Sequence, residues 1–548
     1  MSLTGAELIA QGLAAYGVKH VFAIVSIHNM PLLDAINRLG ETAIIDVRHE
    51  QAGTHAADGY ARATGRMGVM IASTGPGTTN TVTGLYEAQF ASSPVLVITG
   101  QAETAFYGKG LAYVHEAENQ APMLATVTRR VESPRHPQAV GEAFVRVIRD
   151  MHLGRRAPGA LEIPIDLQYG EVPEQSFPPL PEPTVLPRPG LIEQAADVLR
   201  GHSRRIIVAG GGVIAAGAGP MLQALAERLD APVITTVDGR GALPEDHPLC
   251  VGNFYGSAGI QQAVSGAEVT LAIGTKFAIG VDGNGAKHTP PGKLIHIDID
   301  PNVVGRTHHA HLGITADAST ALAGLLGGLA EVSANDAQFN QVVWEARDGV
   351  HAAMRKRLGP DYARMMDILR DRLPREGLWC RDSTIAAYNF GNQLFPIYEP
   401  RTSINPSSGA IGPGLPFALG AAIGSGRPGV LINGDGGFLF HATELATAAQ
   451  YRVPLVVCVF NDGGYGVLRW LQDTRFGRIN ETDLGKMEFA RMAESMGVPG
   501  ERVQTVAAFE QAVTKGLDSG GPYLIDVDME CFEPMEISIM PKKKPVEA

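Results

Sequence analysis

Cysteine, excess positive charge and long apolar runs are all scarce in this sequence of 548 residues. Its four cysteines, Cys250, Cys380, Cys458 and Cys531, form no CxxC pair, which excludes a disulfide framework and the usual structural zinc sites and favours a reducing compartment. The 45 basic and 57 acidic residues leave a net charge of −12, which argues against nucleic acid as a partner. No apolar run approaches the roughly 20 residues that span a membrane, and the first residues carry Glu7 and no basic segment. We therefore expect a cytoplasmic protein without a membrane partner.

Apolar residues are sufficient for several cores, since 45% of the residues are hydrophobic and 19% are charged. Short apolar runs alternate with segments of helical spacing, which predicts an α/β protein of three doubly wound, parallel-sheet domains. The strand candidates are residues 18–25, 68–73, 95–99, 160–165, 205–208, 232–235, 269–273, 293–299, 430–432, 454–460 and 523–527.

Two segments interrupt this alternation. Seven prolines between Pro173 and Pro189 exclude a helix or a central strand and predict an extended linker. A polar, helical stretch at residues 330–348 has no strong apolar run and predicts a second connection. We expect a first domain over residues 1–170, a proline-rich linker over 171–189, a middle domain over 190–330, a linker over 331–355 and a third domain over 356–548.

The strongest chemical signal is INGDGGF at residues 432–438 followed by VFND at 459–462, each after an apolar strand candidate. Asp435 and Asn461 are 26 residues apart, at the carboxyl ends of two strands, where open parallel sheets bind ligands. One carboxylate, one amide oxygen and a backbone carbonyl near Gly463 suit Mg²⁺ that bridges a diphosphate. Glycines 436 and 437 at the start of the next helix would let backbone amides approach that diphosphate.

Several further motifs occur in an order that resembles the thiamine diphosphate enzymes of the acetolactate synthase and 2-oxo acid decarboxylase superfamily. They are VRHEQAGTHAADGYARATG at residues 47–65, STGPGTTN at 73–80, HIDIDP at 296–301 and GAIGPGLPFALGAAI at 409–423. The resemblance covers nearly the whole chain and is nearest to acetolactate synthase large subunits. It implies pyrimidine-binding, middle and diphosphate-binding domains, with thiamine diphosphate and Mg²⁺ as cofactors.

The resemblance also implies roles for particular residues. Glu50 matches the glutamate that contacts N1′ of the aminopyrimidine and shares a proton with it. Gly409 matches the residue whose carbonyl accepts a hydrogen bond from the 4′-amino group, and Ile411 matches the apolar residue that holds the cofactor in its V shape. The metal shell falls on Asp435, Asn461 and the carbonyl of Gly463, and further cofactor contacts fall on Pro76, Asn80, Ser383, Thr384, Gly434, Gly436 and Gly437. Because the two halves of each site come from different chains in this family, the resemblance implies an obligate homodimer, or a homotetramer built as a dimer of dimers.

Two histidines depart from the acetolactate synthase pattern. His28 and His115 fall in the two loops that face the cofactor in the family, where acetolactate synthases typically carry Phe-Gln in place of Val114-His115. A histidine that titrates near neutral pH can protonate an intermediate or orient a carbonyl, so both are catalytic candidates, with ordinary loop histidines as the alternative. His115-Glu116 in place of His-His disfavours simple pyruvate decarboxylase. In the lid, Leu471 stands where acetolactate synthases place a tryptophan, so the acceptor pocket differs from theirs.

The middle domain contains a glycine pattern typical of dinucleotide-binding turns, VAGGGVIAAGAG at residues 208–219. No acidic residue follows at a strand end about 20 residues later, which favours a plain tight turn. The segment KFAIG at 276–280 lacks both arginines of the RFDDR segment of acetolactate synthases that contain FAD. Binding of FAD or ADP by this domain therefore stays an open alternative that the sequence does not favour.

Together these features predict a thiamine diphosphate enzyme that decarboxylates a 2-oxo acid and joins the product to a second carbonyl, as acetolactate synthases do. One alternative is a lyase or decarboxylase that acts on another 2-oxo acid or a 2-hydroxyacyl substrate, which His28, His115 and the altered lid favour. In either case the expected partners are small molecules, 2-oxo acids or aldehydes. A second alternative is a protein that binds thiamine diphosphate without catalysis. Glu50 argues against it, because a protein that only binds the diphosphate does not need this carboxylate.

Overall fold

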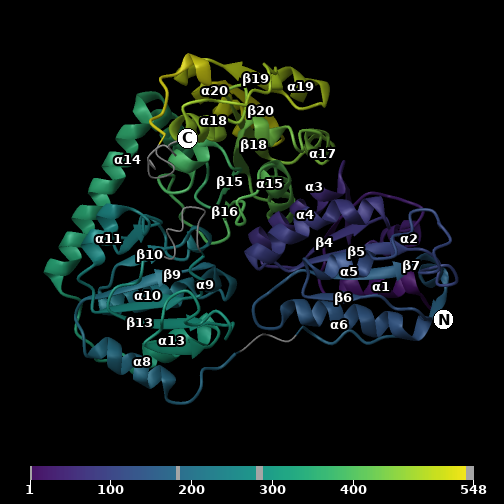
Figure 1. Ribbon diagram of the computed structural model, residues 1–548, viewed down its shortest axis with the longest axis horizontal. Helices are drawn as coiled ribbons and strands as arrows, with labels where there is room; N and C mark the ends of the chain where they lie inside the picture. The colour runs from purple at the N-terminus through teal and green to yellow at the C-terminus, as the bar shows by residue number, and fades with distance from the viewer. Residues whose placement is uncertain (1–2, 181–184, 279–287, 538–548) are drawn as a thin grey trace.

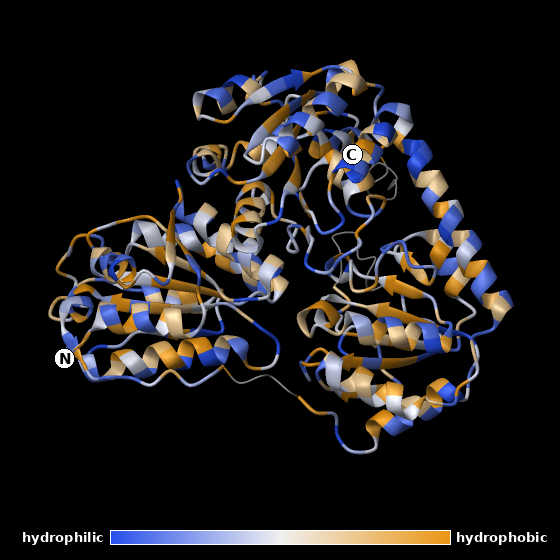
Figure 2. Ribbon diagram, turned by 180° about the vertical axis from the view of Figure 1, so that it is seen from behind, coloured by the Kyte–Doolittle hydropathy of each residue, from blue (hydrophilic) through white to orange (hydrophobic). Residues whose placement is uncertain are grey.

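The computed structural model describes residues 3–180, 185–278 and 288–537, and it consists of three successive α/β units (Figure 1). Each unit has a six-stranded sheet in which every pairing is parallel. The predicted fold class is confirmed. Its physical basis is visible in Figure 2, where the strands are apolar and the outward faces of many helices are polar, because helices cover both faces of each sheet.

The first unit has the strand order β3-β2-β4-β5-β7-β6. Every residue of β4 and β5 at its centre is buried, as expected for strands covered on both faces. A short antiparallel pair, β1 (Leu3–Thr4) and β8 (Glu171–Val172), ties the start of the unit to its end. The sheet strands are β2 (His20–Ala23), β3 (Ala43–Asp46), β4 (Gly68–Ala72), β5 (Val95–Gln101), β6 (Arg130–Glu132) and β7 (Gly159–Pro164), and the helices are α1 (Gly5–Ala15), α2 (Met30–Leu39), α3 (Glu50–Thr64), α4 (Pro76–Ala91), α5 (Gln120–Ala125), α6 (Val140–His152) and α7 (Ile165–Tyr169).

The middle unit has the strand order β11-β10-β9-β12-β13-β14, and β9 and β12 at its centre are buried at every residue. Its strands are β9 (Arg205–Ala209), β10 (Val233–Thr235), β11 (Cys250–Gly252), β12 (Val269–Ile273), β13 (Lys293–Asp298) and β14 (Leu312–Thr315). Its helices are α8 (Leu191–Arg200), α9 (Gly211–Ala215), α10 (Gly219–Leu229), α11 (Ala258–Val264) and α13 (Ala318–Gly328).

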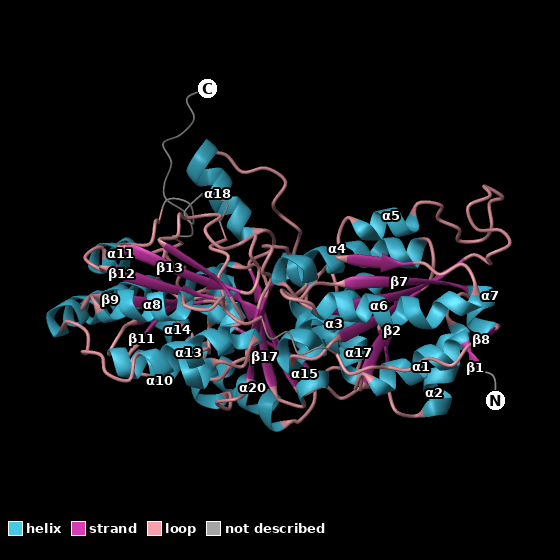
Figure 3. Cartoon of the chain, turned by 90° about the horizontal axis from the view of Figure 1, so that it is seen from below, coloured by secondary structure: helices cyan, strands magenta, loops and turns pink. Residues whose placement is uncertain are grey.

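The third unit has the strand order β16-β15-β17-β18-β20-β19. Its helix α18 stands away from the layers in Figure 3, and none of its residues is buried. The strands are β15 (Leu378–Arg381), β16 (Ser403–Ile404), β17 (Gly429–Gly434), β18 (Leu455–Asn461), β19 (Gly500–Val503) and β20 (Tyr523–Asp528), and the helices are α15 (Gly414–Ser425), α16 (Asp435–Phe438), α17 (Glu444–Gln450), α18 (Gly466–Phe476), α19 (Phe489–Ser495) and α20 (Val506–Asp518).

Two connections join the units. The proline-rich segment begins as β8 and packs Phe177 against the core of the first unit; its residues 181–184 lie outside the described residues. The second connection is largely helical, since α14 (Ala337–Arg372) runs for 36 residues from the middle unit to the third (Figure 1). Gly359, with φ of 74°, interrupts the helical backbone immediately before Pro360. The connection expected at 331–355 therefore continues as helix well past residue 355.

The first and third units meet where α3 packs on α15. A Cβ atom added at Gly59 would lie 2.2 Å from the carbonyl oxygen of Phe417, and one added at Gly420 would lie 1.8 Å from that of Ala56. Only glycine permits two helices to approach this closely. Among the helices of the described residues, none combines the length and apolarity needed to cross a membrane.

Candidate active site

Two neighbouring strands of the third unit place Asp435 and Asn461 at the same edge of the sheet. β17 ends at Gly434 and α16 begins at Asp435, while β18 ends at Asn461. The two strands pair in parallel up to Gly434 opposite Phe460, so their carboxyl ends coincide. Both side chains are buried, with Asp435 3% and Asn461 7% exposed. The sheet therefore brings these two predicted residues together.

Asp462 is a second carboxyl group at this edge. Burial and the neighbouring Asp462, to which it is hydrogen-bonded, raise the pKa of Asp435 to about 7. Burial also raises the pKa of Asp462, although Arg469 nearby opposes that shift. Two adjacent buried carboxyl groups disfavour a second negative charge, so this edge favours a cation.

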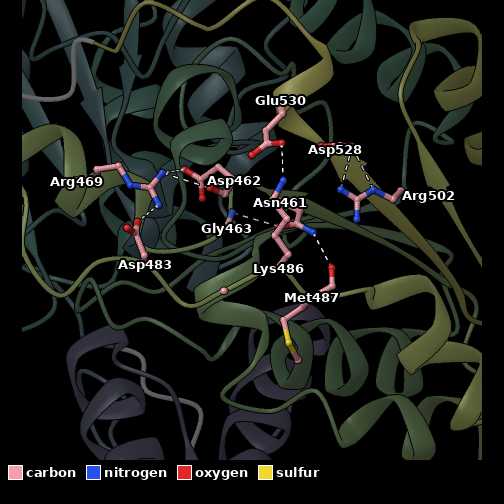
Figure 4. A pocket seen from close by; sticks show the side chains of 11 residues that line it. Asn461, Asp462, Gly463, Arg469, Asp483, Lys486, Met487, Arg502, Asp528 and Glu530 are labelled. Atoms are coloured by element: carbon pink, nitrogen blue, oxygen red, sulfur yellow. Dashed lines mark hydrogen bonds and ion pairs between the residues drawn. The ribbon is translucent and has the colours of Figure 1, made fainter.

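A pocket of about 290 Å³ opens beside Asn461, Asp462 and Gly463 (Figure 4). The amide nitrogen of Asn461 donates hydrogen bonds to the Asp526 carboxylate and to the backbone carbonyl of Met487. Three basic side chains surround the pocket, and each is paired with a carboxylate. The pairs are Arg469 with Asp483 at 2.9 Å, Lys486 with Glu530 at 3.1 Å and Arg502 with Asp528 at 2.9 Å.

Asp382, which the sequence analysis did not identify, holds the loop that carries Gly409 and Ile411. Its carboxylate accepts hydrogen bonds from the backbone N–H of Gly412 at 3.1 Å and of Gly414 at 2.7 Å. The hydroxyl of Ser383 donates a hydrogen bond of 3.0 Å to the backbone carbonyl of Ala410, which lies between Gly409 and Ile411 in the same loop. Gly409 itself is exposed and has φ of 82°, a left-handed conformation that favours glycine.

The residues that surround the GDG turn are tightly packed. A Cβ at Gly434 would lie 2.8 Å from the Thr384 hydroxyl, and one at Gly436 would lie 2.7 Å from the ring of Tyr465. A Cβ at Gly437 would lie 3.1 Å from the Asp382 carboxylate and 3.2 Å from Ile411. The predicted residues Thr384, Ile411 and the three glycines thus converge on the same turn, and Ser383 precedes Thr384 in the chain.

In the first unit, Glu50 is the first residue of α3 and is half-buried. Its carboxylate accepts a hydrogen bond of 2.9 Å from the side-chain amide of Asn80 on α4. Gly77 lies beside it, and a Cβ there would be 3.2 Å from the other carboxylate oxygen. Pro76, also predicted, is the exposed first residue of α4. Glu50, Asn80 and Pro76 therefore form one group at the amino ends of two helices.

His28 and His115 lie next to each other, with ring centroids 5.3 Å apart. His28 is 1% exposed, yet neither of its ring nitrogens has a hydrogen-bond partner in the described structure. Burial, and then the neighbouring His115, lower the pKa of His28, which keeps its ring neutral. His115 is exposed and has φ of 65°. A buried polar ring without a partner is costly and calls for a function.

The two groups of predicted residues lie in different units of the chain. Among the described residues, no hydrogen bond joins Glu50 to Asp435 or Asn461. Hydrogen bonds between the two units involve other residues: Glu87 of α4 accepts from the backbone N–H of Ser407 at 2.6 Å and of Ser408 at 3.0 Å, and the backbone N–H of Arg48 donates to Glu444 of α17 at 2.8 Å. Among the described residues of the single chain, the group around Glu50 and the edge formed by Asp435 and Asn461 are therefore not joined by a hydrogen bond.

The glycine pattern of the middle unit forms a turn in close backbone contact. A Cβ at Gly210 would lie 2.2 Å from the carbonyl oxygen of Gly274, and one at Gly212 would lie 2.6 Å from the Gly274 Cα. These contacts give the glycines a packing role. Residues 279 and 280 of the KFAIG segment lie outside the described residues.

Comparison with known proteins shows which family the sequence matches. The chain matches the family models described as "Thiamine pyrophosphate enzyme, N-terminal TPP binding domain" over residues 3–124, "central domain" over 192–325 and "C-terminal TPP binding domain" over 385–527. It is 32% identical to a probable acetolactate synthase large subunit of Methanocaldococcus jannaschii, with 97% of this chain and 93% of that protein covered. It is 30% identical to the acetolactate synthase isozyme 3 large subunit of Escherichia coli, with 94% and 92% covered. It is also 32% identical to the probable 2-ketoarginine decarboxylase AruI of Pseudomonas aeruginosa, with 97% and 95% covered.

Proposed function

The chain belongs to the thiamine pyrophosphate enzymes, and from that premise we propose that it decarboxylates a 2-oxo acid and joins the remaining acyl carbon to a second carbonyl, as acetolactate synthases do. The observation that carries the proposal is the convergence of Asp435 and Asn461 at one sheet edge while Glu50 and Asn80 stay paired in the first unit. Similarity to acetolactate synthase large subunits over nearly the full length supports this reaction class.

The oxygen atoms at the sheet edge fit Mg²⁺. The donors are the Asp435 carboxylate, the Asn461 amide oxygen and the Gly463 carbonyl, all of them hard oxygen ligands. Burial and the neighbouring Asp462 raise the pKa of Asp435 to about 7, and a cation bound beside this carboxylate would favour its charged form. Among the described residues, no group of three His, Cys, Asp or Glu side chains is placed to hold a metal, so a metal here would depend on the amide and the backbone carbonyl.

Thiamine diphosphate, when bound, supplies a nucleophilic carbon and a sink for the electrons that departing CO₂ leaves behind. Backbone amides at Gly436 and Gly437 would receive its diphosphate, and Ile411 and the Gly409 carbonyl would contact its rings. Glu50 would hold and release a proton at its carboxyl oxygens, and Asn80 orients that carboxyl by donating to one of them.

The paired histidines favour a second candidate function, a decarboxylase or lyase. The neutral, unpartnered ring of His28 beside the exposed His115 could hold a proton at the substrate and release it to a product carbon. In that case the acyl carbon would be protonated and an aldehyde released. Similarity to the probable 2-ketoarginine decarboxylase supports this alternative, and it covers 97% of this chain, as does the similarity to the probable acetolactate synthase large subunit of Methanocaldococcus jannaschii.

We further propose that the active form is a cytoplasmic homodimer or homotetramer. Glu50 lies in the first unit and the metal edge in the third, and among the described residues no hydrogen bond joins Glu50 to Asp435 or Asn461, which is consistent with sites that combine the first unit of one chain with the third unit of another. FAD or ADP in the middle unit stays a prediction, and the close Gly210–Gly274 packing gives no added support for it.

Product analysis tests the function directly. The protein is incubated with Mg²⁺, thiamine diphosphate and pyruvate, then with pyruvate plus an aldehyde, and finally with single larger 2-oxo acids. Acetolactate from pyruvate is the expected product, and the Asp435→Asn variant should give none. A released aldehyde from one larger 2-oxo acid, without acetolactate or acetoin from pyruvate, would establish the decarboxylase instead. Mass spectrometry of the cofactors released by acid would at the same time detect FAD or ADP.

A further inference from the structure

Asn461 differs from the other two proposed metal ligands in one respect. Either oxygen of the Asp435 carboxylate can serve as a donor, and the backbone fixes the Gly463 carbonyl. The amide of Asn461 presents oxygen in one orientation and nitrogen in the other, and only the oxygen can bind a cation. Something in the protein must therefore select the orientation of this amide.

The surroundings of the amide select one orientation. Its nitrogen lies 3.0 Å from a carboxylate oxygen of Asp526 and 3.3 Å from the carbonyl of Met487, and both of these groups only accept. Its oxygen accepts from the backbone N–H of Gly463 at 3.3 Å. The reversed amide would place its oxygen against two acceptors and its N–H₂ against a donor. The hydrogen-bond network thus leaves the Asn461 oxygen on the Gly463 side.

Burial of the Asp526 carboxylate in this position costs folding free energy. It lies on β20, next to β18 in the sheet, and is 0% exposed inside an otherwise apolar strand core. Burial raises the pKa of its carboxyl group, although the Asn461 amide, the Arg502 guanidinium 3.8 Å away and the backbone of Phe489 oppose that rise. One of its oxygens has no hydrogen-bond partner in the described structure. Arg502 has a closer partner in Asp528, at 2.9 Å, so pairing with Arg502 does not explain Asp526. An apolar side chain would avoid the cost of burying this charge.

We propose that Asp526 is a positioning residue that orients the Asn461 amide so that its oxygen is available to the divalent cation. The inference rests on the proposed function, because it takes Asn461 as a metal ligand. Partners of this kind behind a metal ligand typically change metal affinity by about 10- to 100-fold when removed. The effect should appear in metal binding itself, before any turnover.

The test measures the affinity of the full-length protein for Mn²⁺ in the presence of thiamine diphosphate, from the electron paramagnetic resonance signal of free Mn²⁺. Asp526→Leu should weaken Mn²⁺ binding by about 10- to 100-fold. Asp526→Asn should weaken it less, because asparagine retains an oxygen that accepts from Asn461. The matched control is Glu501→Leu, which removes a carboxylate from β19 of the same sheet that bonds to Tyr523 and Lys515.

A second substitution distinguishes whether Asp526 orients the Asn461 amide or only supports the local structure. In Asn461→Asp the ligand has two equivalent oxygens and needs no orientation, so Asp526→Leu combined with Asn461→Asp should bind Mn²⁺ more tightly than Asp526→Leu alone. Unchanged affinity in Asp526→Leu, or no recovery in the double variant, would overturn the positioning role while leaving the proposed function intact. If Asp526→Leu does not fold, Asp526→Glu replaces it in the same comparison, since a longer side chain moves the accepting oxygen. Failure of the unmodified protein to bind Mn²⁺ with thiamine diphosphate would overturn the proposed function as well.

Discussion

At the scale of single residues, the site separates a group that handles a proton from groups that only bind. Glu50 has one partner of its own, the Asn80 amide, and no cation beside it among the described contacts. The metal edge of the third unit has its own carboxylates and does not use Glu50. Loss of the Glu50 carboxylate should therefore affect turnover and spare the binding of the diphosphate end.

The Glu50→Gln variant tests this separation. Glutamine retains an oxygen for Asn80 but cannot accept a proton, so we expect turnover to fall by about 10²- to 10⁴-fold. Metal-dependent binding of thiamine diphosphate, followed by quenching of protein fluorescence, should change little. Glu41→Gln is the control, since Glu41 is exposed and lies 3.9 Å from Lys19. Full activity of Glu50→Gln would refute the proton-handling role.

The partners of the site residues show which part of a site can be predicted from sequence. Glu50, Asp435 and Asn461 each occur in a short local motif, so each could be proposed as a site residue from the sequence alone. Asp382 bonds to a loop 30 residues away, and Asn461 bonds to Asp526 across 65 residues. Only the folded sheet brings such pairs together. A charged residue inside the apolar run YLIDVD was the available signal for Asp526, because a buried charge needs a reason.

At the scale of elements, helices α3 and α4 hold the loop before Gly409 through a buried ion cluster. The guanidinium of Arg62 on α3 pairs with Asp58 at 2.6 Å and with Glu87 of α4 at 2.9 Å, and neither carboxylate side chain is exposed. Arg38 on α2 makes two similar pairs, with Asp34 at 2.8 Å and Glu7 at 3.0 Å, but its own side chain is 58% exposed. Each arginine thus has two carboxylate partners, but the two differ in burial, and Arg62 also donates to the Asn405 carbonyl and the Ser407 hydroxyl.

Replacing each arginine by methionine should separate the two environments. Arg62→Met leaves two buried carboxylates without a cation and should lower the free energy of unfolding by about 3–5 kcal/mol. Arg38→Met should lower it by about 1 kcal/mol or less, because exposed ion pairs contribute little. Urea denaturation of both variants at one pH gives the comparison. Equal losses would show that the Arg62 cluster is not a structural clamp.

The elements also show where sequence patterns stop being informative. Strands β4, β5, β12 and β18 are buried at every residue and read as continuous apolar runs, so they could be predicted. The edge strands β3 and β16 are short and partly exposed, and no strand was expected there. The length of α14 was also not anticipated, because its polar sequence carries no marked apolar stripe and its helical backbone breaks only at Gly359.

At the scale of the whole molecule, the fold class could be predicted from the alternation of apolar strands and helical segments. How the group around Glu50 and the edge formed by Asp435 and Asn461 come together could not. The described contacts between the first and third units include the hydrogen bonds of Glu87, the bond from Arg48 to Glu444 and the close packing of α3 on α15, and none of them is a hydrogen bond from Asp435 or Asn461 to Glu50. A site assembled from two chains would explain why Glu50 is not bonded to Asp435 or Asn461 within one chain. This arrangement can be tested without a structure of the assembly.

Mixing two inactive variants tests it. Glu50→Gln disables the first-unit half of every site, and Asp435→Asn disables the third-unit half. If each site combines halves from two chains, unfolding and refolding an equal mixture gives mixed dimers in which one site carries both changes and the other carries neither. Half of the dimers are then mixed and half of their sites are intact, so about a quarter of the unmodified activity should return. Refolding each variant alone is the control and should recover none. If the two halves of a site came from one chain, every site in the mixture would keep one defect, and the mixture would stay as inactive as its components.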